Sequence, residues 1–339
     1  MLKLTRYLKP FAGAILLVFS LLFVQAMADL ALPGYMSDII NVGVQQGGIE
    51  NAVPQAIRSS EMSRLMLFMT EIEQAEVADS YDLLDRNSLS ARDYASYVKD
   101  YPALADEPVY RLKTIDSAGR ARLNTIFGRP ILTVATLEKQ GAAIFADAGI
   151  TLPPGIDPFI FLSQMTPGQL AEIREFIATQ AAALPESMIT QSAASYLSNE
   201  YRALGMNVGR IQSDYILRIG FIMLAIALLS AACAVAVGFL ASRVAAGFSR
   251  DVRHHLFRKV ENFSNVEFDK FSTASLITRT TNDIQQVQML LVMLLRIVFY
   301  APILGVGGII RALGENVSMS WIIAAAVMAL LALFSRWPF

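Results

Sequence analysis

The sequence contains few side chains that could perform chemistry, and its two histidines are the first candidates. His254 and His255 are adjacent, so they point to different faces of a helix. Two metal ligands on one helix face need a spacing of three or four residues. Cys233 is the only cysteine and lies within an apolar run, which indicates a buried, inert thiol and excludes a cysteine-rich metal site. The sequence therefore predicts no metal centre.

Asp29 is a carboxylate within an otherwise apolar stretch. An ionisable residue inside a membrane is costly and is by default a functional candidate. Asp29 also lies only four residues before Pro33-Gly34, near the expected hydrated end of the stretch. This position favours a hydrated or structural role, and both interpretations stay open.

Catalytic sets are missing from the sequence. Residues 41–205 contain no histidine and therefore no Ser-His-Asp set. The phosphate-binding pattern G-x-x-x-x-G-K-[ST] does not occur anywhere in the chain. We expect no catalytic residue and no cofactor bound by this chain.

The charged stretch 247–283 holds the most distinctive pattern. Ser264 and Glu267 have the spacing of a helix capping box. Large apolar side chains surround this box, namely Phe263, Val266, Phe268 and Phe271. Such side chains at a polar surface indicate either a docking surface or a helical hairpin that packs against itself. The pattern alone does not separate the two.

The composition indicates that the elements carrying or flanking these residues are membrane-spanning segments. The chain has 339 residues, of which 54% are hydrophobic and 17% charged. The charged fraction is below the value of about 25% that is usual in soluble domains. The apolar residues are also bunched, which indicates membrane spans. A net charge of −1 gives no basic surface for nucleic acid.

The pattern along the chain predicts an all-α membrane protein with an inserted domain. A basic amphipathic segment ending at Pro10 favours a helix on the membrane surface rather than a cleaved signal peptide. The predicted segments are an interfacial elbow helix at 1–10, a first span at 11–40, a helical domain at 41–205, a second span at 206–246, a loop at 247–283, a third span at 284–313 and a fourth at 318–339.

Helix signals recur within the inserted domain. They predict helices over Pro54–Asp79, Ser90–Asp100 and Ser187–Leu204, and a helix that begins at Thr166. No alternating strand pattern is evident. In the third span the uncharged part begins after Arg296, so we expect this arginine at an interface, where its side chain reaches toward water.

The distribution of basic residues predicts the orientation. The first nine residues carry three basic side chains and no acid, and the loop from Ala241 to Val287 carries seven basic residues against five acids. The positive-inside rule therefore places the N-terminus and this loop in the cytoplasm and residues 41–205 outside.

Long stretches of the sequence resemble a known family. FSRDVRHHLFRKVENFSNVEFDKFSTASLITRTTNDIQQVQ, LPGYMSDIINVGVQQGGIE and GRIQSDYILRIG are similar to the transmembrane domain of multidrug-type bacterial ABC exporters. The resemblance implies the first four helices of a six-helix domain, with residues 41–205 as a large extracellular insertion after the first helix. It also implies a multi-pass protein of the bacterial cell membrane.

The same resemblance implies a role for the charged loop. Its coupling helix would dock on an ATP-binding domain, in cis or on a partner subunit, through Phe263, Val266, Glu267, Phe268, Asp269, Lys270 and Phe271. ATP and Mg²⁺ would bind that other domain, and a second exporter half would complete a homo- or heterodimer.

The sequence departs from the family pattern because it has four spans rather than six and no ATP-binding domain. We therefore expect a truncated product that is inactive alone. One alternative is a membrane-anchored extracytoplasmic module that binds a ligand or partner through residues 41–205. A regulatory fragment that pairs with an intact exporter half is a third possibility.

Overall fold

The computed structural model describes residues 4–147, 157–165, 168, 186–264 and 273–315, together with 321–322, 325–326 and 328–329. Helices dominate these residues, which confirms the all-α class. The chain divides into two compact units, one formed by Met1–Ser37 with Gly220–Phe339 and the other by Asp38–Ile219. Each unit is described by itself.

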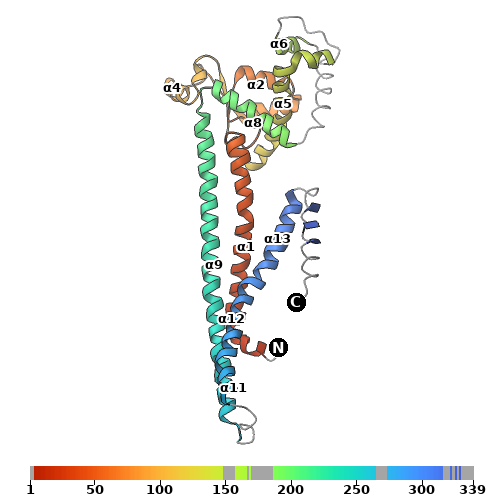
Figure 1. Ribbon diagram of the computed structural model, residues 1–339. Helices are drawn as coiled ribbons and strands as arrows, with labels where there is room; N and C mark the ends of the chain where they lie inside the picture. Colours follow the sequence, from red (N-terminus) through yellow and green to blue (C-terminus); the bar gives the residue numbers. More distant parts are fainter. Residues whose placement is uncertain are drawn as a thin grey trace. The chain divides into compact units, whose positions relative to one another are not determined.

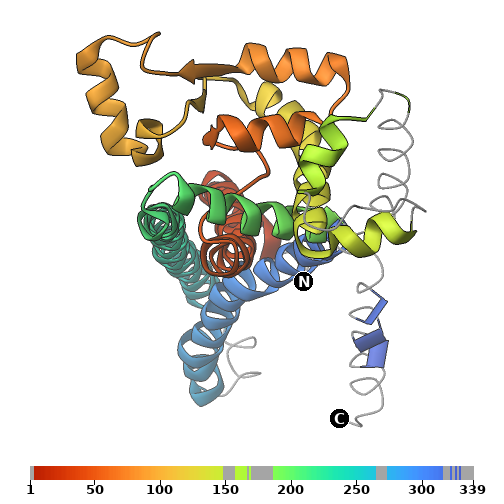
Figure 2. The same cartoon turned by 90° about the horizontal axis from the view of Figure 1, so that it is seen from above.

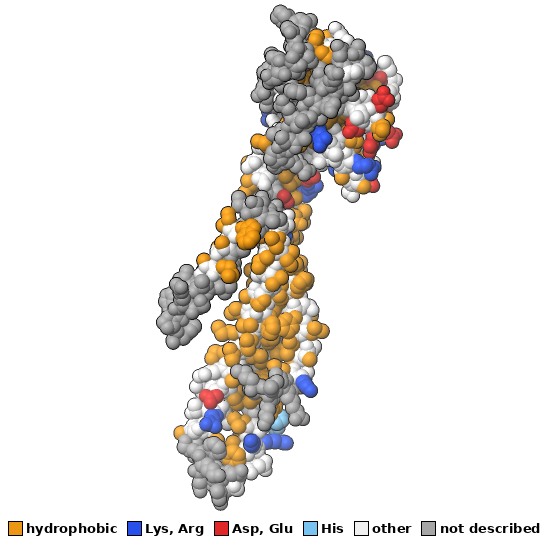
Figure 3. Space-filling model, turned by 90° about the vertical axis from the view of Figure 1, so that its right-hand side faces the viewer, with side chains coloured by type: hydrophobic (Ala, Val, Ile, Leu, Met, Phe, Trp, Pro, Cys, Tyr) orange, Lys and Arg blue, Asp and Glu red, His pale blue; other side chains and the backbone are white. Residues whose placement is uncertain are grey.

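Among the described residues, three helical segments are long and apolar enough to cross a membrane: Tyr7–Gln45, Val208–Glu261 and Ala274–Gly314. The first contains α1 (Ala12–Asp38) and the second is α9 (Val208–Glu261) (Figure 1). The third consists of α11 (Thr273–Thr278), the π-helical turn η4 (Arg279–Asp283), α12 (Ile284–Met293), a second π turn η5 (Leu294–Val298) and α13 (Tyr300–Glu315). Apolar side chains cover much of these helices (Figure 3). The expected fourth span, 318–339, lies mostly outside the described residues.

The proline that was expected to end the first short helix does not do so. Pro10 lies inside the short 3₁₀ helix η1 (Leu4–Phe11), which leads directly into α1. Pro33 lies inside α1, which continues to Asp38 and then into the π turn η2 (Ile39–Gln45). The helix therefore continues well beyond Asp29.

The core of the first unit is built where α1 meets α9 and the third span. Its buried members are Val18, Leu22, Val237, Ala241, Val244 and Leu295. Glycine allows the closest approaches. A Cβ on Gly307 would lie 2.5 Å from Cδ1 of Leu30, so this glycine allows α13 to approach α1 closely. A Cβ on Gly305 would meet no atom of the described residues within 4 Å, so Gly305 makes no such contact there.

Gly247 and Gly238 of α9 give a matched test of this packing. A Cβ on Gly247 would lie 2.5 Å from Cζ of Phe11, whereas one on Gly238 would meet nothing within 4 Å. We expect Gly247→Ala to destabilise the protein by about 1–3 kcal/mol through overpacking. Gly238→Ala should instead stabilise α9 by up to about 1 kcal/mol through helix propensity. Thermal unfolding in neutral detergent measures both, and equal shifts for the two variants would contradict the packing at Gly247.

The second unit combines helices with a small sheet. Its strands are β1 (Ala56–Arg58), β2 (Tyr81–Leu84) and β3 (Val109–Leu112), in the antiparallel order β1-β3-β2. Tyr110 of β3 pairs with Ile57 on one side and Leu83 on the other. The helices are α2 (Ser59–Met66), α3 (Glu71–Ser80), α4 (Ala91–Asp100), the 3₁₀ turn η3 (Pro102–Ala105), α5 (Ser117–Asp147), α6 (Pro158–Ser163) and α8 (Glu186–Ala203) (Figures 1 and 2).

The helix predictions for this unit have mixed outcomes. α4 and α8 confirm the helices expected at Ser90–Asp100 and Ser187–Leu204. The single helix expected over Pro54–Asp79 is wrong, because β1, α2 and α3 share that stretch. Thr70 and Glu73 form a capping box that starts α3 as a separate helix. The helix start expected at Thr166 lies outside the described residues.

Candidate functional site

The predicted coupling residues are only partly described. α9 runs without interruption past Gly247 to Glu261, and the backbone N–H of Phe263 donates to the carbonyl of Val260 at 3.1 Å. The other six members of the predicted set lie outside the described residues: Val266, Glu267, Phe268, Asp269, Lys270 and Phe271. The capping box expected at Ser264 also needs one of these residues. This prediction remains untested by the geometry.

Within the first unit, Asp29 of α1 joins two other helices. Its Oδ1 accepts a hydrogen bond from Oγ of Ser230 on α9 at 2.6 Å. Its Oδ2 accepts a hydrogen bond from the hydroxyl of Tyr300, the first residue of α13. One carboxylate thus connects three long apolar helices, and we call Asp29, Ser230 and Tyr300 the intramembrane cluster.

The position of Ser230 indicates the depth of this cluster. Between Arg218 and Arg243, α9 carries no charged side chain, and Ser230 lies near the middle of that stretch. At about 1.5 Å per residue, Ser230 is about 18 Å along the helix from either arginine. The hydrogen bond therefore brings Asp29 to the most apolar part of α9. The sequence had placed Asp29 near a hydrated end of its apolar stretch because Pro33-Gly34 follows four residues later.

A cavity of about 400 Å³ lies beside the intramembrane cluster. Gln25 and Leu22 of α1 line it, as does Val237 of α9. The third span contributes apolar side chains together with Arg296 and Tyr300. The cavity is mainly apolar, and its polar groups come from a few side chains on two of the three helices. Such a combination is typical of a small-molecule site.

Arg296 lies in the π turn η5, four residues before Tyr300. Four residues correspond to about 6 Å along a helix, so Arg296 lies close to Tyr300 along the span. The interface position that the sequence predicted for Arg296 stays a prediction. Arg296 is exposed, and no ion pair to it is found among the residues that the structure describes. A cation in this environment marks a functional site more often than a structural one.

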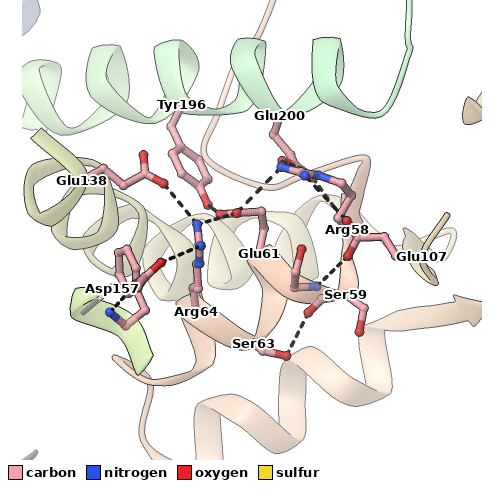
Figure 4. Close-up of polar contacts among 12 residues, drawn as sticks. Arg58, Ser59, Glu61, Ser63, Arg64, Glu107, Glu138, Asp157, Tyr196 and Glu200 are labelled. Atoms are coloured by element: carbon pink, nitrogen blue, oxygen red, sulfur yellow. Dashed lines mark hydrogen bonds and ion pairs between the residues drawn. The ribbon is translucent and has the colours of Figure 1, made fainter. Parts of the chain in front are cut away.

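A second polar cluster lies inside the second unit, where Figure 4 shows side chains of α2 and α8 pointing toward one another. Glu200 of α8 accepts hydrogen bonds from Nη2 of Arg58 at 2.7 Å and from the backbone N–H of the same arginine at 2.9 Å. Glu61 accepts from the hydroxyl of Tyr196 at 2.5 Å and pairs with Arg64 at 2.8 Å.

The buried carboxylates of this second cluster, Glu61 and Glu200, are both paired with arginines. The hydrogen bond from Arg58 to Glu200 raises the pKa of Arg58. Burial raises the pKa of the Tyr196 hydroxyl, and the neighbouring Glu61 raises it further. Burial also raises the pKa of Glu138, which lies 3.5 Å from Arg64. Because every buried carboxylate has a partner, the cluster holds α2 against α8 and offers no free group to a ligand.

Sequence reasoning missed most of both clusters. No sequence motif or helical spacing links the partner residues to one another. These residues are Ser230, Tyr300, Glu61 and Glu200. Asp29 and Arg296 gave a signal, because charged residues are rare in apolar stretches. Their partners come from other helices and could not be identified from local pattern.

Comparison with known proteins matches residues 178–337 to the ABC transporter transmembrane region. An uncharacterized ABC transporter ATP-binding protein of Mycobacterium tuberculosis (strain H37Rv) is 37% identical over 122 residues, which are 36% of this chain and 21% of that protein. The uncharacterized ABC transporter ATP-binding protein YfiB of Bacillus subtilis is 38% identical over 118 residues, 35% of this chain and 20% of that protein. Each similarity spans only about a fifth of the relative's length.

These similarities agree with the geometry of the first unit. The matched residues 178–337 include all of α9 and the third span, two of the three segments that could cross a membrane. Residues 178–337 are thus similar to an ABC transporter transmembrane region, in agreement with the resemblance in the sequence.

Proposed function

We propose that this chain forms the membrane-spanning part of an ATP-driven ABC exporter in the bacterial cell membrane. The observation that carries the proposal is the match of residues 178–337 to the ABC transporter transmembrane region. The long apolar helices and the intramembrane cluster support it, since both suit a protein that moves a substrate across a bilayer. ATP and Mg²⁺ belong to an ATP-binding domain, in cis or on a partner subunit. A second exporter half completes the transport pathway.

The coupling element of the proposal is the segment Phe263–Phe271. α9 carries apolar residues through its middle and basic residues in its last turn, where Arg258 and Lys259 lie. The segment follows directly on this charged end. A docked ATP-binding domain would act on it and shift the helices between two arrangements with inward and outward access.

Phe271→Asp tests the coupling. A charge on the docking surface should reduce both the amount of co-purifying ATP-binding protein and the ATPase activity of the purified transporter by at least tenfold. Phe257→Asp is the matched control, because Phe257 is an exposed phenylalanine of α9 outside the segment. The measurement uses the protein as its host produces it, with the ATP-binding domain attached or co-purified. Equal activity of the two variants would contradict coupling through this segment.

The alternative function is a membrane-anchored module that binds a ligand outside the cell. It is favoured by the separate core of the second unit and by a polar cavity of about 670 Å³ within it, lined in part by Gln46, Ser195 and Arg202. An anchored module needs no ATPase. Purification without any ATP-binding domain, together with full ligand binding by that unit, would favour this alternative.

A further inference from the structure

We propose that the cavity beside the intramembrane cluster binds a single-chain amphiphile with an anionic head group, and that Arg296 holds the acidic group. The inference rests on the proposed function, because it names the class of substrate that the membrane part takes. Nothing in the sequence comparison specifies this class.

The charge of the cavity is the first argument. The Arg296 guanidinium lines it and carries a positive charge. Asp29 does not line the cavity, its oxygens accept hydrogen bonds from Ser230 and Tyr300, and no ion pair between Asp29 and Arg296 is found among the described residues. A guanidinium has a planar fork of donors that matches a carboxylate, phosphate or sulfate. The cavity therefore selects an anion and repels a cation.

The walls of the cavity are the second argument. Leu22, Val237, Val292 and Ile297 present apolar surface, which suits a hydrocarbon chain. Gln25 and Tyr300 are the other polar side chains of the lining, and the Tyr300 hydroxyl is occupied by Asp29. A neutral apolar ligand would leave the guanidinium without a partner in a dry environment, which is costly.

The volume of the cavity favours a ligand with one hydrocarbon chain over a ligand with two. Its volume of about 400 Å³ lies near the lower end of the range of about 300–1,000 Å³ found for small-molecule sites. A fatty acid or alkyl sulfate has one chain and one anionic group, as this space requires. A phospholipid brings a second acyl chain for which the cavity offers no further room.

The test labels the purified chain with a photoactivatable fatty acid in phosphatidylcholine nanodiscs at pH 8. We expect labelled peptides that contain Leu22–Gln25 and Val292–Ile297, and a loss of labelling of at least tenfold in Arg296→Gln. Arg296→Lys should keep part of the labelling because the positive charge remains. Arg311→Gln is the matched control, since Arg311 is an exposed arginine of the same span outside the cavity lining and should leave labelling unchanged.

Competition and blocking sharpen the test. Oleate should compete for labelling at least tenfold better than oleyl alcohol, which has the same chain without the charge. Val292→Trp should block labelling by filling the cavity while leaving Arg296 in place, so a loss there cannot be ascribed to the missing charge. Thermal unfolding confirms that each variant is folded.

Several results would overturn the inference. Equal labelling of Arg296→Gln and the unaltered chain would show that Arg296 does not hold the ligand. Equal competition by oleyl alcohol and oleate would show that the ligand needs no anionic group. Stronger competition by phosphatidylglycerol than by oleate would replace the single-chain ligand with a membrane lipid. Labelling needs no ATP, so a negative labelling result says nothing about coupling through Phe271. The two experiments therefore test the ligand proposal and the proposed function independently.

Discussion

Replacing Glu200 by alanine should lower the free energy of unfolding of the second unit by about 3–5 kcal/mol, the range for a buried ion pair that loses one partner. The Glu200 side chain is 3% exposed and accepts hydrogen bonds from Nη2, Nε and the backbone N–H of Arg58. Its removal leaves the guanidinium without its main partner. Since the Arg58 side chain is 27% exposed, water can hydrate it partly, and we expect a loss near the lower end of the range.

Hydrogen exchange of peptides from β1, α2 and α8 in the intact chain measures this loss locally, so the membrane helices do not need to unfold. Glu76→Ala is the control. Glu76 pairs with Arg122 at 3.0 Å, but the two side chains are 37% and 64% exposed. A surface pair of this kind contributes about 0–1 kcal/mol. Similar losses in the two variants would show that the Glu200 pair does not hold α2 against α8.

The second large effect is expected for Phe127→Ala, at about 3–5 kcal/mol. Phe127 of α5 is 0% exposed, and its ring lies edge to face with Tyr81 at a centroid distance of 5.8 Å. The substitution leaves a cavity at the centre of the core that joins the sheet to α5. Exchange protection should fall in β2 and α5 together, because the ring contacts both.

Two controls accompany this variant. Ile72→Ala removes an apolar side chain that is 82% exposed, so we expect a change within about 0.5 kcal/mol. Phe127→Leu keeps most of the apolar volume and should cost clearly less than Phe127→Ala. If all three variants lost the same stability, the core position of Phe127 would be wrong.

The membrane helices could be predicted from sequence because their signal is local. Each apolar stretch is longer than the roughly 20 residues that a span requires. Their ends were harder to predict. Pro10 was expected to end the surface helix, but it lies inside η1, which leads directly into α1.

The small sheet could not be predicted for the opposite reason. β1, β2 and β3 are three or four residues long, too short to display an alternating pattern. Thr70 and Glu73 did carry a helix-start signal inside the single helix predicted over Pro54–Asp79. The apolar periodicity across the stretch outweighed it.

The candidate site needed the fold. Asp29 and Arg296 could be identified from sequence as candidates because charged residues are rare in apolar stretches. Ser230 and Tyr300, by contrast, are ordinary residues of membrane helices. Only the meeting of α1, α9 and α13 gives these hydroxyls a partner. The depth of Asp29 likewise follows from its contact with Ser230 and not from its own position in the sequence.

The π turn η5, Leu294–Val298, has a consequence for how the third span can vary. A π turn contains about one residue more than an α turn, and each residue of an α-helix is rotated by about 100° from the last. Deleting one residue from η5 would therefore restore a regular α-helix and turn every side chain before it by about that angle relative to Tyr300. The contact between Tyr300 and Asp29 thus depends on the number of residues in the span as well as on their identity. Insertions and deletions there would change which side chains face the cavity even where the span keeps its apolar character.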